Sequence, residues 1–173
     1  MRYLFPESSF TLLGDIYQTV NSVTTMQRYE DYEKVFGAGL VRIRLSRCYR
    51  SSSDINALAF RLIDEEERPI AEEYSYFART VRKPQYVICR DMFSCLGPIL
   101  ERLEKYRSVA VIVDGEEDAL AVKAHLHGQK EAQLLLSPDD EMKSRLSVIP
   151  LLLAKGLEFD AVILFGCIRS NEK

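Results

Sequence analysis

Several residue types that mark common kinds of functional site are scarce in this 173-residue chain. It has no tryptophan, only two histidines, and four cysteines that include no Cys-x-x-Cys pair. Structural zinc sites usually draw their ligands from such closely spaced pairs, so we expect reduced thiols and no metal centre. His125 and His127 are two apart on a predicted helix, and one face of a helix cannot present both to a metal.

The chain also lacks a basic charge excess and a long apolar run. Its net charge of -3 argues against a self-sufficient DNA-binding module, because phosphate contacts dominate such affinities. No apolar run approaches the ~18 residues of a membrane span, and residues 1–7 lack the apolar core of a signal peptide. We therefore expect a soluble, cytoplasmic protein with no membrane partner.

Two glycine-rich nucleotide motifs are missing as well. No Gly-x-x-x-x-Gly-Lys-[Ser/Thr] phosphate loop occurs, so the chain is not expected to hydrolyse a nucleotide alone. No Gly-x-Gly-x-x-Gly follows a strand, which argues against a Rossmann-type oxidoreductase. The dense acidic run at 64–67 is typical of a solvated helix end, and it does not indicate a nuclease centre.

What the chain does contain is an alternation of apolar segments and amphipathic segments. Strands are predicted over residues 9–13, 41–45, 85–89, 108–113, 132–136, 146–149 and 161–165. Helices are predicted within residues 21–39 and over 55–63, 92–106 (interrupted by Gly-Pro at 97–98) and 116–127. Strands that alternate with helices of this length predict an α/β fold with a mostly parallel sheet.

Three polar clusters interrupt this pattern. Gly14 and Asp15 directly follow a predicted strand, and Gln18 comes three residues later; alone, Gly-Asp is typical of a turn. Tyr49 and Arg50 lie between a predicted strand and a helix start. There the positive helix end and a guanidinium together suit a phosphate.

The third cluster is Lys-Gly-Leu-Glu-Phe-Asp at residues 155–160, between two predicted strands. A purely structural connection would more often use Asn-Gly or Asp-Gly turn chemistry. Ligands of open α/β sheets bind at the carboxyl ends of the strands, so we expect a site there.

In this order the three clusters resemble the Gly-Asp-x-x-Gln, Asn-Tyr-Arg-Ser and Lys-Gly-Leu-Glu-Phe motifs of superfamily 1 helicases of the UvrD/Rep type. The resemblance covers residues 10–165. It implies a three-layer RecA-like (P-loop NTPase-like) fold, with residues 1–20 ending a first RecA-like domain and residues 21–173 forming most of a second. The chain would then be a fragment of an ATP-dependent DNA helicase or translocase.

The resemblance also implies roles for the nucleotide-binding residues. Gln18, beside Gly14 and Asp15, would sense the γ-phosphate of ATP. Tyr49 would line the adenine pocket, and Arg50 would bind the γ-phosphate across an interdomain cleft, since its fork stays charged and donates two hydrogen bonds.

The remaining roles concern the ribose and the nucleic acid. Glu158 would reach the ribose and Gly156 would line the nucleotide cleft. Lys155 and Ser51 would lie on the track for DNA, either a single strand or a duplex junction. Without a phosphate loop, and without the Asp-Glu pair that holds magnesium, ATP and Mg²⁺ would be bound mainly by the first RecA-like domain. The fragment alone is predicted to be inactive.

Three departures from the family pattern leave alternatives open. Pro150 and Leu152 replace the usual Thr and His that contact DNA, and Cys48 replaces the Asn of Asn-Tyr-Arg-Ser. These positions resemble HelD-type relatives, ATPase motors that act on RNA polymerase. A non-catalytic α/β binding module is the other alternative, with all three clusters serving only as loops.

Overall fold

The computed structural model describes residues 4, 7–14, 29–43, 45, 47–62, 75–76, 83–127 and 131–166. The chain divides into two compact units. Unit 1 comprises residues 1–13 and 26–87, and unit 2 comprises residues 14–25 and 88–173. The predicted domain boundary at residue 20 falls outside the described residues and stays a prediction.

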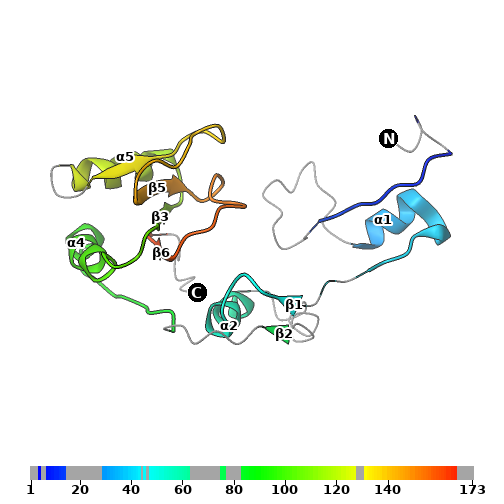
Figure 1. Cartoon of the computed structure of the whole chain (residues 1–173), viewed down its shortest axis with the longest axis horizontal. Helices are drawn as coiled ribbons and strands as arrows, with labels where there is room; N and C mark the ends of the chain where they lie inside the picture. Colours follow the sequence, from blue (N-terminus) through cyan, green and yellow to red (C-terminus); the bar gives the residue numbers. More distant parts are fainter. Residues whose placement is uncertain are drawn as a thin grey trace. The chain divides into compact units, whose positions relative to one another are not determined.

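Unit 2 contains a four-stranded sheet in the order β4-β5-β3-β6. Its strands are β3 (Val109–Val113), β4 (Ala132–Leu134), β5 (Leu146–Pro150) and β6 (Ala161–Leu164), all paired in parallel. Helices α4 (Met92–Arg102) and α5 (Glu116–Leu126) lie alongside it (Figure 1). The predicted α/β class with a parallel sheet is confirmed, and the arrangement is consistent with a piece of a three-layer RecA-like fold.

The two faces of this sheet are covered differently. On the first face, Val109, Val111 and Val113 of β3 pack with buried residues of both α4 and α5. On the second face, Ala110 and Ile112 pack with Leu135 and Ile149, and the connection between β5 and β6 covers this cluster. A continuous apolar run such as β3 fits this interior position, because both of its faces are buried.

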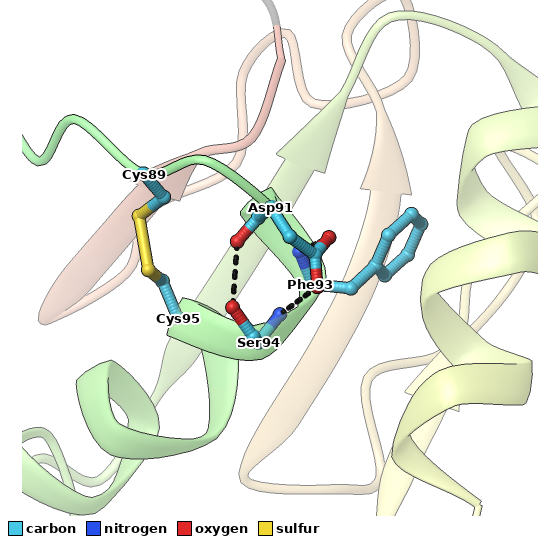
Figure 2. The surroundings of a disulfide bond; sticks show 5 residues. All are labelled: Cys89, Asp91, Phe93, Ser94 and Cys95. Carbon is cyan, nitrogen blue, oxygen red and sulfur yellow. Dashed lines mark hydrogen bonds between the residues drawn. A yellow bond between two sulfur atoms is a disulfide. The ribbon is translucent and has the colours of Figure 1, made fainter.

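Helix α4 has a well-defined start (Figure 2). The Asp91 carboxylate accepts hydrogen bonds from the Phe93 and Ser94 N–H groups, at 3.1 and 3.2 Å. Around this cap, Cys89 and Cys95 form a disulfide, so the expectation of reduced thiols is wrong for this pair. The predicted interruption at Gly97-Pro98 is also wrong, because α4 continues through Pro98 to Arg102, with Leu96 and Leu100 buried in the core.

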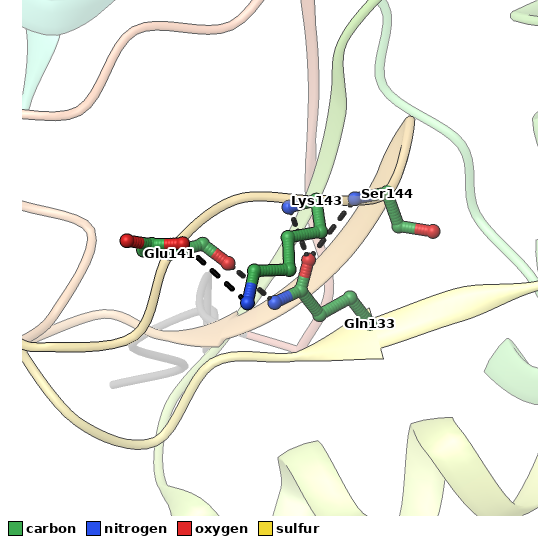
Figure 3. A network of polar contacts seen from close by, with 4 residues as sticks. All are labelled: Gln133, Glu141, Lys143 and Ser144. Carbon is green, nitrogen blue, oxygen red and sulfur yellow. Dashed lines mark hydrogen bonds and ion pairs between the residues drawn. The ribbon is translucent and has the colours of Figure 1, made fainter.

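A side chain of β4 fixes the loop that leads into β5 (Figure 3). The Gln133 amide N–H₂ donates to the Glu141 carbonyl at 2.6 Å. Its amide oxygen accepts from the Lys143 and Ser144 N–H groups at 2.7 and 3.1 Å, and Lys143 pairs with Glu141 at 3.4 Å. Both ends of the Gln133 amide are hydrogen-bonded to the loop backbone. The side chain therefore holds the loop next to β4 just before β5 begins.

Unit 1 has short elements. They are α1 (Tyr29–Phe36), η2 (Gly37–Gly39), β1 (Arg47–Cys48), α2 (Ser53–Arg61) and β2 (Ser75–Tyr76). Strands β1 and β2 pair in parallel, and α2 confirms the helix predicted from residue 55. Helix α1 lies inside the predicted range 21–39, whose first residues, 21–28, are outside the described part.

Three predicted strands are wrong. Residues 9–13, the described residues of 41–45, and 85–89 have no regular secondary structure. In the 41–45 segment Val41, Ile43 and Leu45 are about four-fifths exposed, so no neighbouring strand satisfies the alternating pattern. Arg42 instead pairs with Glu30 and Glu33 of α1, at 3.7 and 3.6 Å.

Among the described residues, no helix is both long enough and apolar enough to cross a membrane.

Candidate functional site

The first candidate cluster occupies the loop between β1 and α2 in unit 1. Tyr49 and Arg50 are exposed there, and Ser51 is half-buried. The Arg47 guanidinium donates to the Tyr49 hydroxyl at 3.4 Å, and its carbon lies 5.8 Å from the centre of the Tyr49 ring. A cation over an aromatic face is attractive, so Arg47 helps to set the direction of the ring.

The start of α2 anchors this loop. The buried Ser52 caps the helix by accepting a hydrogen bond from the Ile55 N–H at 3.3 Å. The Asn56 side chain donates to the carbonyls of Ser51 and Ser52, at 3.1 and 3.0 Å. The backbone just after Arg50 is therefore fixed to the first turn of α2. The exposed Tyr49 and Arg50 side chains lie directly before this fixed backbone.

The backbone N–H groups of this loop favour negative charge. The Ser51 N–H donates to the Cys48 thiol and lowers the pKa of Cys48 below its ordinary value, against the opposing effect of partial burial. The Arg50 N–H and the positive charge of the Arg50 side chain contribute in the same direction. These groups therefore stabilise the ionised form of the Cys48 thiol.

The second cluster, Lys155 to Asp160, lies in the connection from β5 to β6 in unit 2. The Leu153 and Ala154 N–H groups donate to the Pro150 carbonyl at 3.0 and 3.2 Å, forming a first turn. A second turn is closed by the Leu157 N–H, which donates to the Ala154 carbonyl at 3.2 Å. Gly156 is the third residue of this turn and has φ +85°, the conformation that favours glycine at that position of a type II turn.

Two polar side chains, one in the second turn and one directly after it, face the solvent. Lys155 and Glu158 are exposed, whereas Ala154 and Phe159 on either side of them pack against the second face of the sheet. Apolar anchors thus flank an outward-facing lysine and glutamate.

Only part of this connection lies at the carboxyl ends of the strands, where the site was expected. Its first turn follows the carboxyl end of β5, as predicted, but the segment then runs to the amino end of β6. Asp160 therefore lies at the edge of the sheet opposite to the one where ligands of α/β sheets usually bind.

Asp160 joins the starts of β3 and β6. One carboxylate oxygen accepts from the Arg107 N–H, the Ser108 N–H and the Ser108 hydroxyl, at 3.1, 3.0 and 3.2 Å. The Asp160 N–H in turn donates to the Ser108 hydroxyl oxygen at 3.0 Å. The Ser108 N–H, followed by its hydroxyl, lowers the pKa of Asp160, because both stabilise the ionised form. Asp160 positions the segment that carries Glu158.

The predicted residues fall into two described groups. Tyr49, Arg50 and Ser51 share one loop of unit 1, and residues 155–158 share the connection between β5 and β6 in unit 2. Gly14 is exposed and has no regular structure, while Asp15 and Gln18 lie outside the described residues. Each unit is described by itself, so a single site that combines the groups stays a prediction.

Sequence reasoning missed Arg47 and Asn56, and it did not predict the positioning role of Asp160. Arg47 contacts Tyr49, Asn56 holds the loop carbonyls, and Asp160 holds the start of β6. Asp160 ends the third polar cluster, but its partner Ser108 is 52 residues away in the chain. No local pattern reveals a contact at that separation.

No protein-family model matches this chain, and no curated protein matches it. Within the described ranges, no group of three His, Cys, Asp or Glu side chains could hold a metal ion.

Proposed function

We propose that this chain is the second RecA-like part of an ATP-dependent helicase or translocase of the UvrD/Rep type. In this proposal it forms one side of an interdomain ATP cleft and part of a nucleic-acid track. The phosphate loop and most Mg²⁺ ligands come from another RecA-like domain. The proposed place of action is the cytoplasm.

One observation carries the proposal. The Tyr-Arg pair is exposed on a loop directly before the capped start of α2, and the Asn56 side chain holds the carbonyls that follow the pair. A nucleotide has an aromatic base and a polyanionic tail, and this loop offers an aromatic ring and a guanidinium at adjacent positions. An arginine suits a γ-phosphate because it stays charged and can donate two hydrogen bonds as charge shifts.

The turn at residues 154–157 supports the same proposal from unit 2. Lys155 is suited to a phosphate of the nucleic-acid backbone, and Glu158 to the hydroxyl groups of a ribose. Both side chains are exposed, Lys155 within the turn and Glu158 directly after it, and the packed residues Ala154 and Phe159 flank them.

The experiment measures nucleic-acid-stimulated ATP hydrolysis by the protein in which this chain acts together with a phosphate-loop domain. Arg50→Ala should lower kcat about 10³-fold or more, the range in which an arginine finger acts. Arg50→Lys should not restore the rate, since an ammonium lacks the planar fork. Arg61→Ala, at the far end of α2, is the matched control and should leave the rate unchanged.

The isolated chain should show no sustained ATP turnover. If Arg50→Ala hydrolyses ATP as fast as the parent protein, the loop is no part of an ATP site, and a non-catalytic α/β binding module becomes the better account.

One observation favours a second candidate, a HelD-type motor acting on RNA polymerase. Leu152 stands where the family pattern has a DNA-contacting histidine, and its side chain is 63% exposed beside the exposed Leu151. An exposed apolar pair at the carboxyl end of β5 is better suited to a protein surface than to phosphates.

This alternative predicts co-purification with RNA polymerase and weak duplex unwinding. Leu152→Asp should weaken the polymerase association, whereas Leu120→Asp, which changes another exposed leucine on α5, should not. Strong unwinding without any polymerase association would exclude the HelD-type candidate.

A further inference from the structure

The disulfide between Cys89 and Cys95 lies on both sides of the start of α4, close to residue 88, where the chain returns to unit 2. Cys89 lies two residues before the cap residue Asp91, and Cys95 lies in the first turn of the helix. Their Cα atoms are 6.6 Å apart, and both side chains are half-buried (Figure 2). A small thiol or disulfide can therefore reach this pair.

A second set of contacts holds the same turn without the disulfide. Asp91 accepts the Phe93 and Ser94 N–H groups, and the Ser94 hydroxyl donates to the Asp91 carbonyl at 2.8 Å. Further along α4, Leu96 and Leu100 are fully buried in the core. Because cap and core hold the helix from Asp91 onward, the helix does not depend on the disulfide.

The residues before Asp91 are in a different situation. Residues 83–90 have no regular secondary structure, and Ile88, the first residue of this segment in unit 2, is 98% exposed. The described hydrogen bonds of this part of unit 2 begin at Asp91. The disulfide is thus the contact that ties residue 89 to the helix.

We propose that Cys89 and Cys95 form a reversible redox clasp that controls where the connecting segment at residues 83–90 becomes fixed to unit 2. In the oxidised state the connection is held from Cys89 onward. In the reduced state it is held only from Asp91 onward, which lengthens the unfixed connection without disturbing α4 or the sheet.

The chemistry is thiol–disulfide exchange with a low-molecular-weight disulfide of the glutathione class as oxidant. One protein thiolate attacks a sulfur of the oxidant and releases one small thiolate, which leaves a mixed disulfide. The second protein thiolate attacks the protein sulfur of that mixed disulfide and releases the other small thiolate. Two protein thiols lose two electrons and two protons, and one small disulfide becomes two thiols.

Arg90 provides a direct probe, because it is exposed and lies inside the bracket. Trypsin cleaves after arginine only when the local backbone can open into its active site. Proteolysis of this kind follows the population of the opened segment, so it should respond to a clasp around the segment.

The experiment uses the full chain with Cys48→Ser and Cys167→Ser, so that only the bracketing pair can react. After equilibration with oxidised glutathione, both remaining cysteines should resist alkylation, and cleavage after Arg90 should be about tenfold slower than after reduction. Cleavage after Lys105, exposed beyond α4, is the internal control and should not change. With Cys89→Ser also present, cleavage after Arg90 should be fast in both conditions.

Three outcomes would overturn the proposal. Both cysteines could stay fully alkylatable after oxidation, so that no bond forms. Cleavage after Arg90 could be equally fast in both states. Reduction could also abolish the cooperative melting of unit 2, which would make the bond a structural support instead of a clasp.

Discussion

Segments 41–45 of unit 1 and 109–113 of unit 2 are both rich in β-branched residues, yet they lie in opposite environments. Val41 and Ile43 are 81% and 80% exposed, whereas Val109, Val111 and Val113 have no exposed surface. In the first segment Arg42 and Arg44 alternate with the apolar residues, so at most one face can be buried. In the second every residue is apolar, and only a sheet interior satisfies both faces.

The same contrast extends to the two units. All buried apolar side chains among the described residues belong to unit 2, while Ser52 is the buried residue described in unit 1. Strand propensity is therefore not enough by itself. A strand forms where neighbouring strands and a helix layer can cover it, as α4 and α5 cover β3.

The largest expected effect tests this contrast directly. Val111→Asp places a carboxylate in the core between the sheet and the helices, and it should lower the free energy of unfolding by about 4 kcal/mol or more. The matched change Val41→Asp, at an exposed position, should change it by less than about 0.5 kcal/mol. Urea unfolding followed by circular dichroism measures both. A large loss in Val41→Asp would mean that segment 41–45 is buried in solution.

The fold of unit 2 was readable from the sequence. Its strands and helices follow from apolar runs and caps that lie within a few residues of one another, and β3, α5, β5 and β6 all form where predicted. The strands expected in unit 1 were wrong because period-two alternation specifies only which residues share a face. It does not supply a pairing partner.

The candidate site was predictable in part. The exposure of Tyr49 and Arg50 before a helix start, and the turn at Gly156, agree with what local sequence indicates. The contacts of Asp160 with Ser108 and the bond between Cys89 and Cys95 were not predicted. The first depends on strand order. The second depends on how residues 89–91 meet the start of α4.

Gly156 offers a smaller test of the turn in unit 2. An L-residue at φ +85° is strained, so Gly156→Ala should lower the free energy of unfolding by about 1 kcal/mol. Gly156→Asn should cost less, because asparagine tolerates the left-handed region better. Gly39→Ala is the control from unit 1, with no positive φ and open space around the position. The melting temperature should be lowest for Gly156→Ala and intermediate for Gly156→Asn. The Gly39→Ala control should melt close to the parent protein.

Helix α2 of unit 1 and helix α4 of unit 2 both begin at a side chain that accepts backbone N–H groups, so removing each cap compares the two units. Asp91→Ala removes the carboxylate that accepts two N–H groups at the start of α4, a helix that buries Leu96 and Leu100 in the core, and it should cost about 1 kcal/mol of global stability. Ser52→Ala removes the cap of α2, which has no buried residue within it. Its effect on global unfolding should stay below about 0.5 kcal/mol, while amide exchange across residues 53–61 becomes faster. Equal global losses would contradict the difference between the units.

The smallest effect concerns Asp160, whose carboxylate is exposed and joins β3 to β6. The Ser108 N–H and hydroxyl lower its pKa in the folded chain, so the ionised form stabilises the fold. That contribution is complete above the ordinary aspartate pKa of about 3.9 and is lost as the pH falls through the lower folded value. Asp160→Asn should therefore melt slightly below the parent protein at neutral pH, and the gap should close in acid. A gap for Asp160→Asn that persists below the folded pKa would mean that the carboxylate charge is not what holds the two strands together.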